Sequence, residues 1–138
     1  MWKYFKLSEL THTNTGLLNV PNKEQIDNLT DLVENILDPL REMLNAPIKV
    51  NSGFRSALVN QYIKGAKTSQ HMKGEAADLD FHDNKLLFDT IRKNFDFDQL
   101  IWEAGDEKQP AWVHVSYKKN KDNRFEVLRM KNGKYTKM

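Results

Sequence analysis

The chain has 138 residues, of which 39% are hydrophobic and 29% charged, as is typical of a soluble protein with one buried core. Its formal net charge of +2 is too small to indicate a nucleic-acid-binding protein, so we expect no nucleic-acid partner. The sequence contains no cysteine, which excludes disulfides, cysteine-bound metals and thiol catalysis. Any metal site must therefore use histidine and carboxylate ligands, and the chain has only four histidines.

The sequence shows no repeat, no low-complexity segment and no Gly/Ser linker, so we expect a single domain over residues 1–138 and a monomer. No run of about 18 apolar residues is present, and we therefore expect no membrane insertion. Residues 1–6 are too polar for a secretory signal, which predicts that the chain is made in the cytoplasm without a signal peptide.

The clearest predicted helix covers residues 23–44, where apolar side chains recur at steps of three and four and form one stripe. Asn22 is the expected N-cap, and Gln25 completes a pattern similar to a capping box. Pro39 lies inside the pattern, and we expect it to kink or split the helix because it has no backbone N–H.

The rest of the chain predicts strands and short helices joined by turns. We expect strands at residues 48–50, 75–81, 99–103 and 112–117, helices at 56–64 and 84–93, and a polar loop at 65–74. Asn132-Gly133 is a strong hairpin signal, so residues 124–130 are expected to pair with the segment around Tyr135. These elements predict an α+β fold with a small, mainly antiparallel sheet packed with helices.

Residues 69–80 are the segment richest in side chains that can do chemistry. His71 and Asp78 are separated by a glycine and two alanines, and small residues allow a close approach of the backbone to a neighbour or ligand. Strand alternation places Asp78 and Asp80 on one face of the strand, opposite an apolar face. Carboxylates on the inner side of a sheet cost free energy unless they are paired or metal-bound.

A second segment, residues 111–117, shows the same alternation. Trp112, His114 and Ser116 share one face, and the opposite face is apolar. His114 is therefore expected on a strand whose back is buried. A single histidine in such a strand is more often structural than a metal ligand, and the same holds for His71 taken alone.

Three segments together resemble a known family of peptidoglycan metallopeptidases. They are Ser52-Gly53-Phe54-Arg55-Ser56, the pattern Ser69-x-His71-x-x-Gly74-x-Ala76-x-Asp78, and Trp112-x-His114. In this order they are similar to the zinc D-Ala-D-Ala carboxypeptidases and L-alanyl-D-glutamate endopeptidases, whose superfamily includes the hedgehog domain. The resemblance covers residues 5–117, and the short chain looks like the phage and prophage endolysins of this family.

The resemblance implies Zn²⁺ as the cofactor, with His71, Asp78 and His114 as its ligands. Two histidines and a carboxylate, with a fourth position open to water, are a ligand set that catalytic zinc sites use. The implied reaction is the hydrolysis of peptide bonds in peptidoglycan stem peptides or cross-links by metal-activated water. Cleavage of the D-Ala-D-Ala bond by a D,D-carboxypeptidase, of the L-alanyl-D-glutamate bond by an endopeptidase, and of an interpeptide bridge all remain open.

The resemblance also implies roles for residues around the metal. Arg55 matches an arginine that holds the substrate or the developing oxyanion, and its alternative is a structural pairing with a carboxylate such as Asp80. Ser69 can bind substrate or brace its loop. Trp112 is expected to line the substrate groove, although tryptophan is more often found in the core.

The general base is the point at which the sequence departs from the best-known members. Many of these carry an acid three positions before the second histidine, where this chain has Ala111. The nearest upstream acids are Glu103, Asp106 and Glu107. We predict Glu103 as the base, because it ends a strand and its position is better fixed than that of an acid in a turn-rich loop.

Two other functions compete with this prediction. The missing acid at position 111 is compatible with a weakly active or inactive zinc-containing module that binds cell wall or a protein partner. A basic cluster near the C-terminus, with Lys118, Lys119 and Lys121, can attract an anionic polymer, but a solvated hairpin surface is the more common reason for such a run. If the chain is a lytic enzyme, we expect it to reach the cell wall after phage- or holin-type release.

Overall fold

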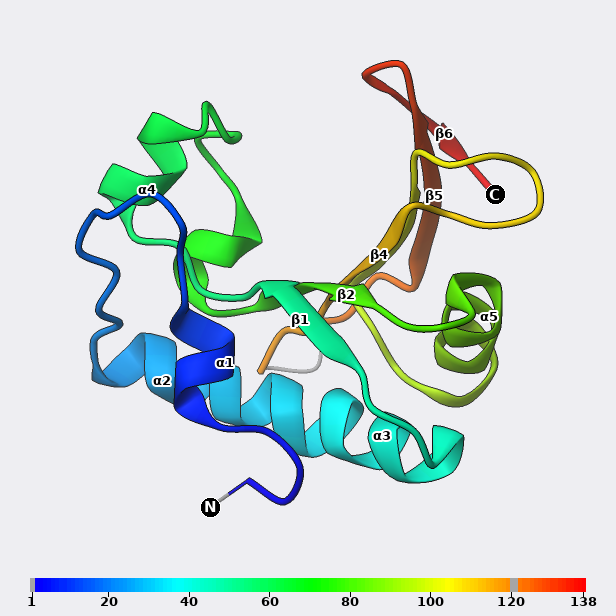
Figure 1. The fold of residues 1–138 in the computed structure, drawn as a ribbon, viewed down its shortest axis with the longest axis horizontal. Coiled ribbons are helices and arrows are strands. Elements are labelled where there is room, and N and C mark those ends of the chain that lie inside the picture. Colours follow the sequence, from blue (N-terminus) through cyan, green and yellow to red (C-terminus); the bar gives the residue numbers. More distant parts are fainter. Residues whose placement is uncertain (1, 120–121) are drawn as a thin grey trace.

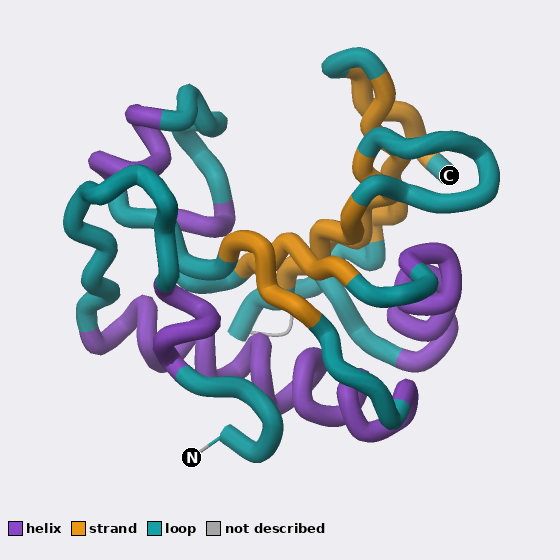
Figure 2. The backbone as a smooth tube through the Cα atoms, in the orientation of Figure 1, coloured by secondary structure: helices purple, strands orange, loops and turns teal. Residues whose placement is uncertain are grey.

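The computed structural model describes residues 2–119 and 122–138, which form one six-stranded sheet with helices packed against it (Figures 1 and 2). The strands are β1 (Lys49–Ser52), β2 (Ala76–Asp80), β3 (Gln99–Glu103), β4 (Trp112–Ser116), β5 (Glu126–Lys131) and β6 (Lys134–Lys137). Their order in the sheet is β1-β2-β4-β3-β5-β6. Only the β3–β5 pair is parallel among these neighbours, so the predicted α+β class with a mainly antiparallel sheet is confirmed.

The helical elements are mostly short. They are α1 (Leu7–Thr11), α2 (Lys23–Leu32), the π-helical turn η1 (Val33–Leu37), α3 (Asp38–Leu44), α4 (Ala57–Tyr62), the 3-10 helix η2 (Gln70–Lys73) and α5 (Asn84–Asn94). The loop predicted at residues 65–74 thus contains η2, a turn of helix that its polar sequence did not indicate. No helix in the described ranges is both long enough and apolar enough to cross a membrane.

The elements α2, η1 and α3 follow one another directly and form the long rod predicted for residues 23–44 (Figure 1). Asn22 caps it through a mutual pair of hydrogen bonds with Gln25, each 2.8 Å long, which confirms the capping box. The N–H of Asp38 donates to the carbonyl of Val33, one residue further back than in an α-helix. This widened turn ends just before Pro39, so the expected interruption takes the form of a change in helical register rather than a break.

The core lies between this rod and one face of the sheet. Leu32 and Leu40 of the rod are fully buried, as are Leu79 of β2 and Val113 of β4, and all belong to one hydrophobic cluster. Figure 2 shows the rod running along one side of the band of strands. Because side chains alternate along a strand, the residues next to Leu79 and Val113 point to the opposite face of the sheet.

The C-terminal hairpin (residues 126–137) consists of β5 and β6. Its turn is formed by Asn132 and Gly133, whose φ angles of 53° and 76° are both in the left-handed region, as a type I′ turn requires, so the predicted hairpin is confirmed. The parallel pairing of β5 with β3 was not predicted. Within the predicted basic cluster, Lys118 Nζ lies 3.6 Å from Asp98 Oδ1. Lys121 is outside the described residues.

Candidate metal centre

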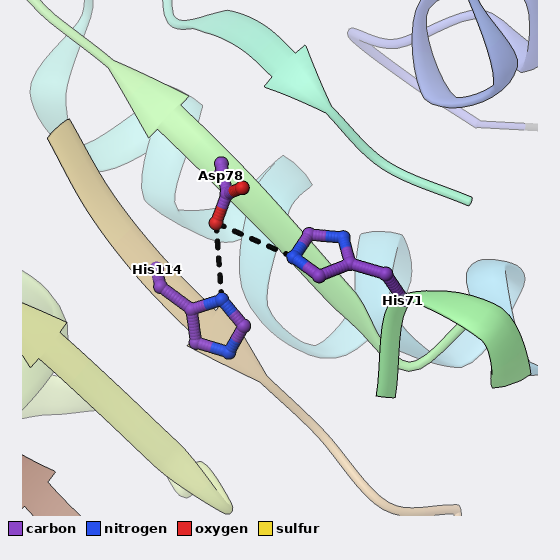
Figure 3. A group of neighbouring side chains, drawn as sticks. All are labelled: His71, Asp78 and His114. Atoms are coloured by element: carbon purple, nitrogen blue, oxygen red, sulfur yellow. Dashed lines mark hydrogen bonds and ion pairs between the residues drawn. The ribbon is translucent and has the colours of Figure 1, made fainter. Parts of the chain in front are cut away.

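Three side chains from separate elements meet on the face of the sheet opposite the core (Figure 3). We call His71 of η2, Asp78 of β2 and His114 of β4 the His–Asp–His group. Asp78 Oδ1 lies 3.0 Å from His114 Nδ1 and 3.4 Å from His71 Nε2. One ligand atom of each residue lies within 4.8 Å of the others. The antiparallel register places Asp78 directly opposite His114, so pairing of β2 with β4 brings two of the three predicted ligands together.

The orientation of His71 is set by the backbone around it. Ser69 caps η2 by accepting the backbone N–H of His71 at 3.2 Å. The Nδ1 atom of His71 lies 2.7 Å from the carbonyl oxygen of Gly53, which can only accept a hydrogen bond, so Nδ1 carries the proton. Donation from this nitrogen to a backbone carbonyl is the usual way in which a metal-binding histidine is oriented, with the other nitrogen left for the metal.

With Nδ1 protonated, two hydrogen-bond acceptors face each other across the site. The Nε2 of His71 and the carboxylate of Asp78 both present lone pairs, so a cation between them is needed to offset their repulsion. Burial lowers the pKa of the His71 imidazole despite the opposing field of Asp78, which disfavours a proton at Nε2. Burial by itself would raise the pKa of Asp78, but the neighbouring His71 and His114 outweigh it and hold that pKa well below its usual value.

A metal ion satisfies these acceptors. Two imidazole nitrogens and one ionised carboxylate oxygen form a donor set that fits Zn²⁺ and leaves a position for water or substrate. The neutral state of His71 and the ionised state of Asp78 are the protonation states that metal binding requires. The residues present therefore fit the cofactor that the sequence implied.

Gly74 connects the helix of His71 to the strand of Asp78. Its φ is +76°, and a Cβ atom at this position would lie 2.4 Å from the carbonyl oxygen of Gln25 in α2. The glycine therefore permits both a left-handed turn and a close approach of η2 to α2. These two constraints explain why a glycine stands between the two ligands.

Gly74→Ala is expected to destabilise the protein by at least about 1–2 kcal/mol, because alanine is strained at positive φ and its methyl group would collide with the backbone of α2. Urea unfolding of the metal-free protein measures this change. Gly133→Ala is the matched control for φ alone, since Gly133 has the same φ but no atom within 4 Å of the added Cβ. Equal destabilisation by the two substitutions would contradict the role of the contact with α2.

The His–Asp–His group lies in a cleft of about 660 Å³. Strands β2, β4 and β3 form its floor, while residues 64–66 and 68–71 line one side and the C-terminal hairpin lines the other. All the residues predicted for the site line this cleft; besides the three ligands they are Arg55, Ser69, Glu103 and Trp112.

Glu103 faces the cleft from the end of β3 and is only 7% exposed. Burial, reinforced by Asp78 and opposed by His114, raises the pKa of its carboxyl group to about 7. The other two candidates for the base are engaged elsewhere and do not line the cleft. Asp106 accepts the N–H groups of Lys108 and Gln109 in a turn, and Glu107 forms an ion pair with Arg129 at 2.6 Å.

Arg55 enters the cleft from the loop before α4. Its Nη2 atom is 3.4 Å from Ser69 Oγ, and its buried Nε has no hydrogen-bond partner among the described residues. The alternative pairing of Arg55 with Asp80 is not found. Arg55 forms no ion pair within residues 2–119 and 122–138, and Asp80 instead accepts a hydrogen bond from the side-chain amide of Asn84 at 2.8 Å. The guanidinium is therefore available to a ligand.

The C-terminal hairpin contributes to the cleft, which its sequence did not indicate. Leu128 and Tyr135 line it, as do Gln99 of β3 and Arg124 just before β5. No local motif marks these residues, because their position depends on the pairing of β5 with β3. Unlike Trp112, Trp102 does not line the cleft. It is 3% exposed and belongs to the core, where it contacts Phe88 with the ring centres 5.3 Å apart.

Comparison with known proteins agrees with this geometry. A stretch of 37 residues is 54% identical to the zinc D-Ala-D-Ala carboxypeptidase of Streptomyces albus G, and it covers 27% of this chain and 14% of that protein. The chain thus matches only a small part of that relative's length. A sequence model of the peptidase M15 family matches residues 3–116, which include every residue of the His–Asp–His group. On this match over most of its length, the chain belongs to the peptidase M15 family.

Proposed function

We propose that the chain is a zinc-dependent peptidase that hydrolyses peptide bonds in bacterial peptidoglycan, in stem peptides or cross-links. The observation that carries the proposal is the convergence of the His–Asp–His group, Glu103 and Arg55 in one cleft. Family membership supports the peptidase activity, and the name of the Streptomyces relative supports a substrate that contains D-alanine.

In this proposal His71, Asp78 and His114 hold Zn²⁺. The bound ion would polarise the scissile carbonyl and lower the pKa of water to about 7, which supplies a nucleophile at neutral pH. The hydrogen bond from His71 to Gly53 fixes the direction of that imidazole ring, and the β2–β4 register places His114 beside Asp78. The ligands therefore need little rearrangement to bind the ion.

Glu103 is the proposed general base. Its carboxylate would accept the proton of the attacking water and later donate it to the leaving amine. Burial raises the pKa of this carboxyl group in the metal-free protein, which favours its proton uptake. Glu103 pairs with Trp112 across the sheet, and its backbone carbonyl accepts the N–H of Ala111 at 2.9 Å, so Glu103 lies next to the position where better-known members carry an acid. A base at position 103 would thus replace the acid missing at position 111.

Arg55 is proposed to bind a substrate carboxylate or the developing oxyanion, with Ser69 bracing it and Trp112 providing an apolar side of the groove. The unpartnered Nε of Arg55 and its position beside the His–Asp–His group support this role. A planar guanidinium donates two parallel hydrogen bonds to an anionic group, which a lysine cannot do.

Arg55→Ala is expected to lower kcat/KM for peptide hydrolysis by about 10²–10³, as the loss of an oxyanion donor does, and to leave zinc affinity unchanged. Arg55→Lys should recover only part of the loss, because it restores the charge but not the planar pair of donors. Steady-state kinetics measure the effect, with Arg92→Ala on the exposed side of α5 as a matched control. Full activity of Arg55→Ala would contradict the assignment.

The test of the function is digestion of purified peptidoglycan with added Zn²⁺ or with a chelator, followed by mass spectrometry of the soluble products. Zinc-dependent release is expected. Release of single D-alanine would identify a D,D-carboxypeptidase, whereas larger fragments would identify an endopeptidase and name the bond. No release by folded protein that binds zinc would overturn the proposal in favour of a wall- or partner-binding module.

The cell wall is the place of action that this substrate implies. We extend the proposal to an endolysin-type role, in which the protein reaches the wall through a separate phage- or holin-type pore. Expression inside bacterial cells with and without such a pore tests this route, since lysis is expected only when both are present.

A further inference from the structure

The C-terminal hairpin forms one side of the cleft although it lies outside residues 3–116, the part that the family model matches. Leu128 of β5 and Tyr135 of β6 line the cleft, and Arg55 and Ser69 line it from residues near α4. In Figure 1, β5 and β6 rise at one end of the sheet, at the right of the view, and α4 with the loop that follows rises at the left. The hairpin therefore adds to the cleft a surface that the matched region does not supply.

The strand register explains why Tyr135 faces the cleft. Glu103 of β3 pairs with Met130 of β5, and Met130 pairs with Tyr135 of β6. Directly paired residues project from the same face of a sheet, so Tyr135 shares the face of Glu103. The next residue, Thr136, pairs with Arg129 and projects from the opposite face.

The hairpin is anchored to the rest of the sheet. The carboxylate of Asp98, just before β3, is fully buried and accepts hydrogen bonds from Nε and Nη2 of Arg124 at 3.0 and 2.8 Å. The side-chain amide of Gln99 donates to Glu126 at 2.6 Å. These contacts and the β3–β5 pairing hold the start of β5 in place, so the cleft has a fixed side there.

Tyr135 has the chemistry of a peptide-binding side chain. The residue is 59% exposed, so much of its surface is available to a ligand. Partial burial, with the nearby carboxylates of Glu103 and Asp78, raises the phenol pKa further above neutral, so the protonated hydroxyl can donate a hydrogen bond. A ring that packs on apolar groups and a hydroxyl that donates to a carbonyl together suit an extended peptide.

We propose that Tyr135 is a specificity-determining residue that contacts the part of the substrate peptide lying across the His–Asp–His group from Arg55. The inference rests on the proposed function and deepens it, because it makes the preferred substrate an extended peptide that spans the cleft from Arg55 to the C-terminal hairpin. A peptide confined to the scissile bond would not reach Tyr135.

The test compares the hydrolysis of two peptide substrates by the zinc-loaded protein. One substrate is the synthetic stem pentapeptide L-Ala-γ-D-Glu-L-Lys-D-Ala-D-Ala, which contains both candidate bonds, and the other is its shortest fragment that the unaltered protein still cleaves. Tyr135→Ala is expected to lower kcat/KM for the pentapeptide about tenfold or more, mainly through KM, and to leave the short fragment unaffected. Tyr135→Phe keeps the ring and removes the hydroxyl, so its kcat/KM for the pentapeptide should lie between those of Tyr135→Ala and the unaltered protein.

The controls separate a substrate contact from a structural role. Thr136→Ala alters the same strand on the opposite face and should match the unaltered protein, and zinc affinity should be equal in all variants. An unchanged pentapeptide rate in Tyr135→Ala, or an equal loss for both substrates, would overturn the inference while leaving the proposed function intact. No cleavage of the pentapeptide by unaltered protein that digests purified peptidoglycan would also overturn the inference, whereas no zinc-dependent release from peptidoglycan would overturn the proposed function.

Discussion

His114→Ala is expected to abolish peptide hydrolysis and to weaken zinc binding together. Removing the imidazole takes away one of three proposed ligands and the partner of Asp78, which lies 3.0 Å away. The loss of zinc affinity should exceed the roughly 10–100-fold that follows from removing only a hydrogen-bond partner of a metal ligand. Titration against a chromophoric chelator measures the affinity, and release of soluble fragments from peptidoglycan measures the activity.

The matched control is His82→Ala, since His82 is exposed and lies outside the cleft. Zinc affinity and activity are expected to be unchanged in this variant. Undiminished activity of His114→Ala would refute the assignment of the metal ligands. Loss of zinc binding in both variants would instead indicate a general effect on folding, which circular dichroism of the two metal-free proteins would reveal.

Glu103→Gln is expected to retain zinc and to lower kcat by about 10²–10⁴, the range that a positioned general base contributes. The substitution keeps the shape of the side chain and removes its ability to accept a proton. Steady-state kinetics on the pentapeptide measure the loss. Glu107→Gln is the control, because Glu107 pairs with Arg129 and does not line the cleft. A normal kcat in Glu103→Gln would show that another group acts as the base.

Glu103→Gln is also expected to change how the stability of the protein depends on pH, which can be measured without an activity assay. In the metal-free folded protein the pKa of Glu103 is raised to about 7, from an ordinary value of 4.5. The folded state then binds more protons than the unfolded state between these pH values, so the Glu103 contribution makes the free energy of unfolding fall as pH rises from about 4.5 to 7. Urea unfolding across this range should show that contribution in the unaltered protein and not in Glu103→Gln.

Much of the fold follows from local sequence patterns. The three- and four-residue steps of residues 23–44 require one buried stripe, Asn22 can satisfy the free N–H groups of the first turn, and Asn132-Gly133 permits the left-handed turn of a hairpin. Alternation along β2 and β4 likewise determines that Asp78 and His114 lie on the face opposite the core. These features depend on residues close together in the chain, so the sequence was sufficient to predict them.

The tertiary structure decided the features that depend on residues far apart in the chain. Local patterns favoured Glu103 over Asp106 and Glu107 only because it ends a strand. The β3–β4 pairing places Glu103 in the cleft, whereas Glu107 pairs with Arg129 and neither Glu107 nor Asp106 lines the cleft. The carbonyl of Gly53 sets the protonated nitrogen of His71 across 18 residues of sequence. The parallel pairing of β5 with β3 brings Tyr135 to the site. Hydrogen bonding between strands and the direction of a buried carbonyl are set by how the whole chain packs, and no short motif encodes them.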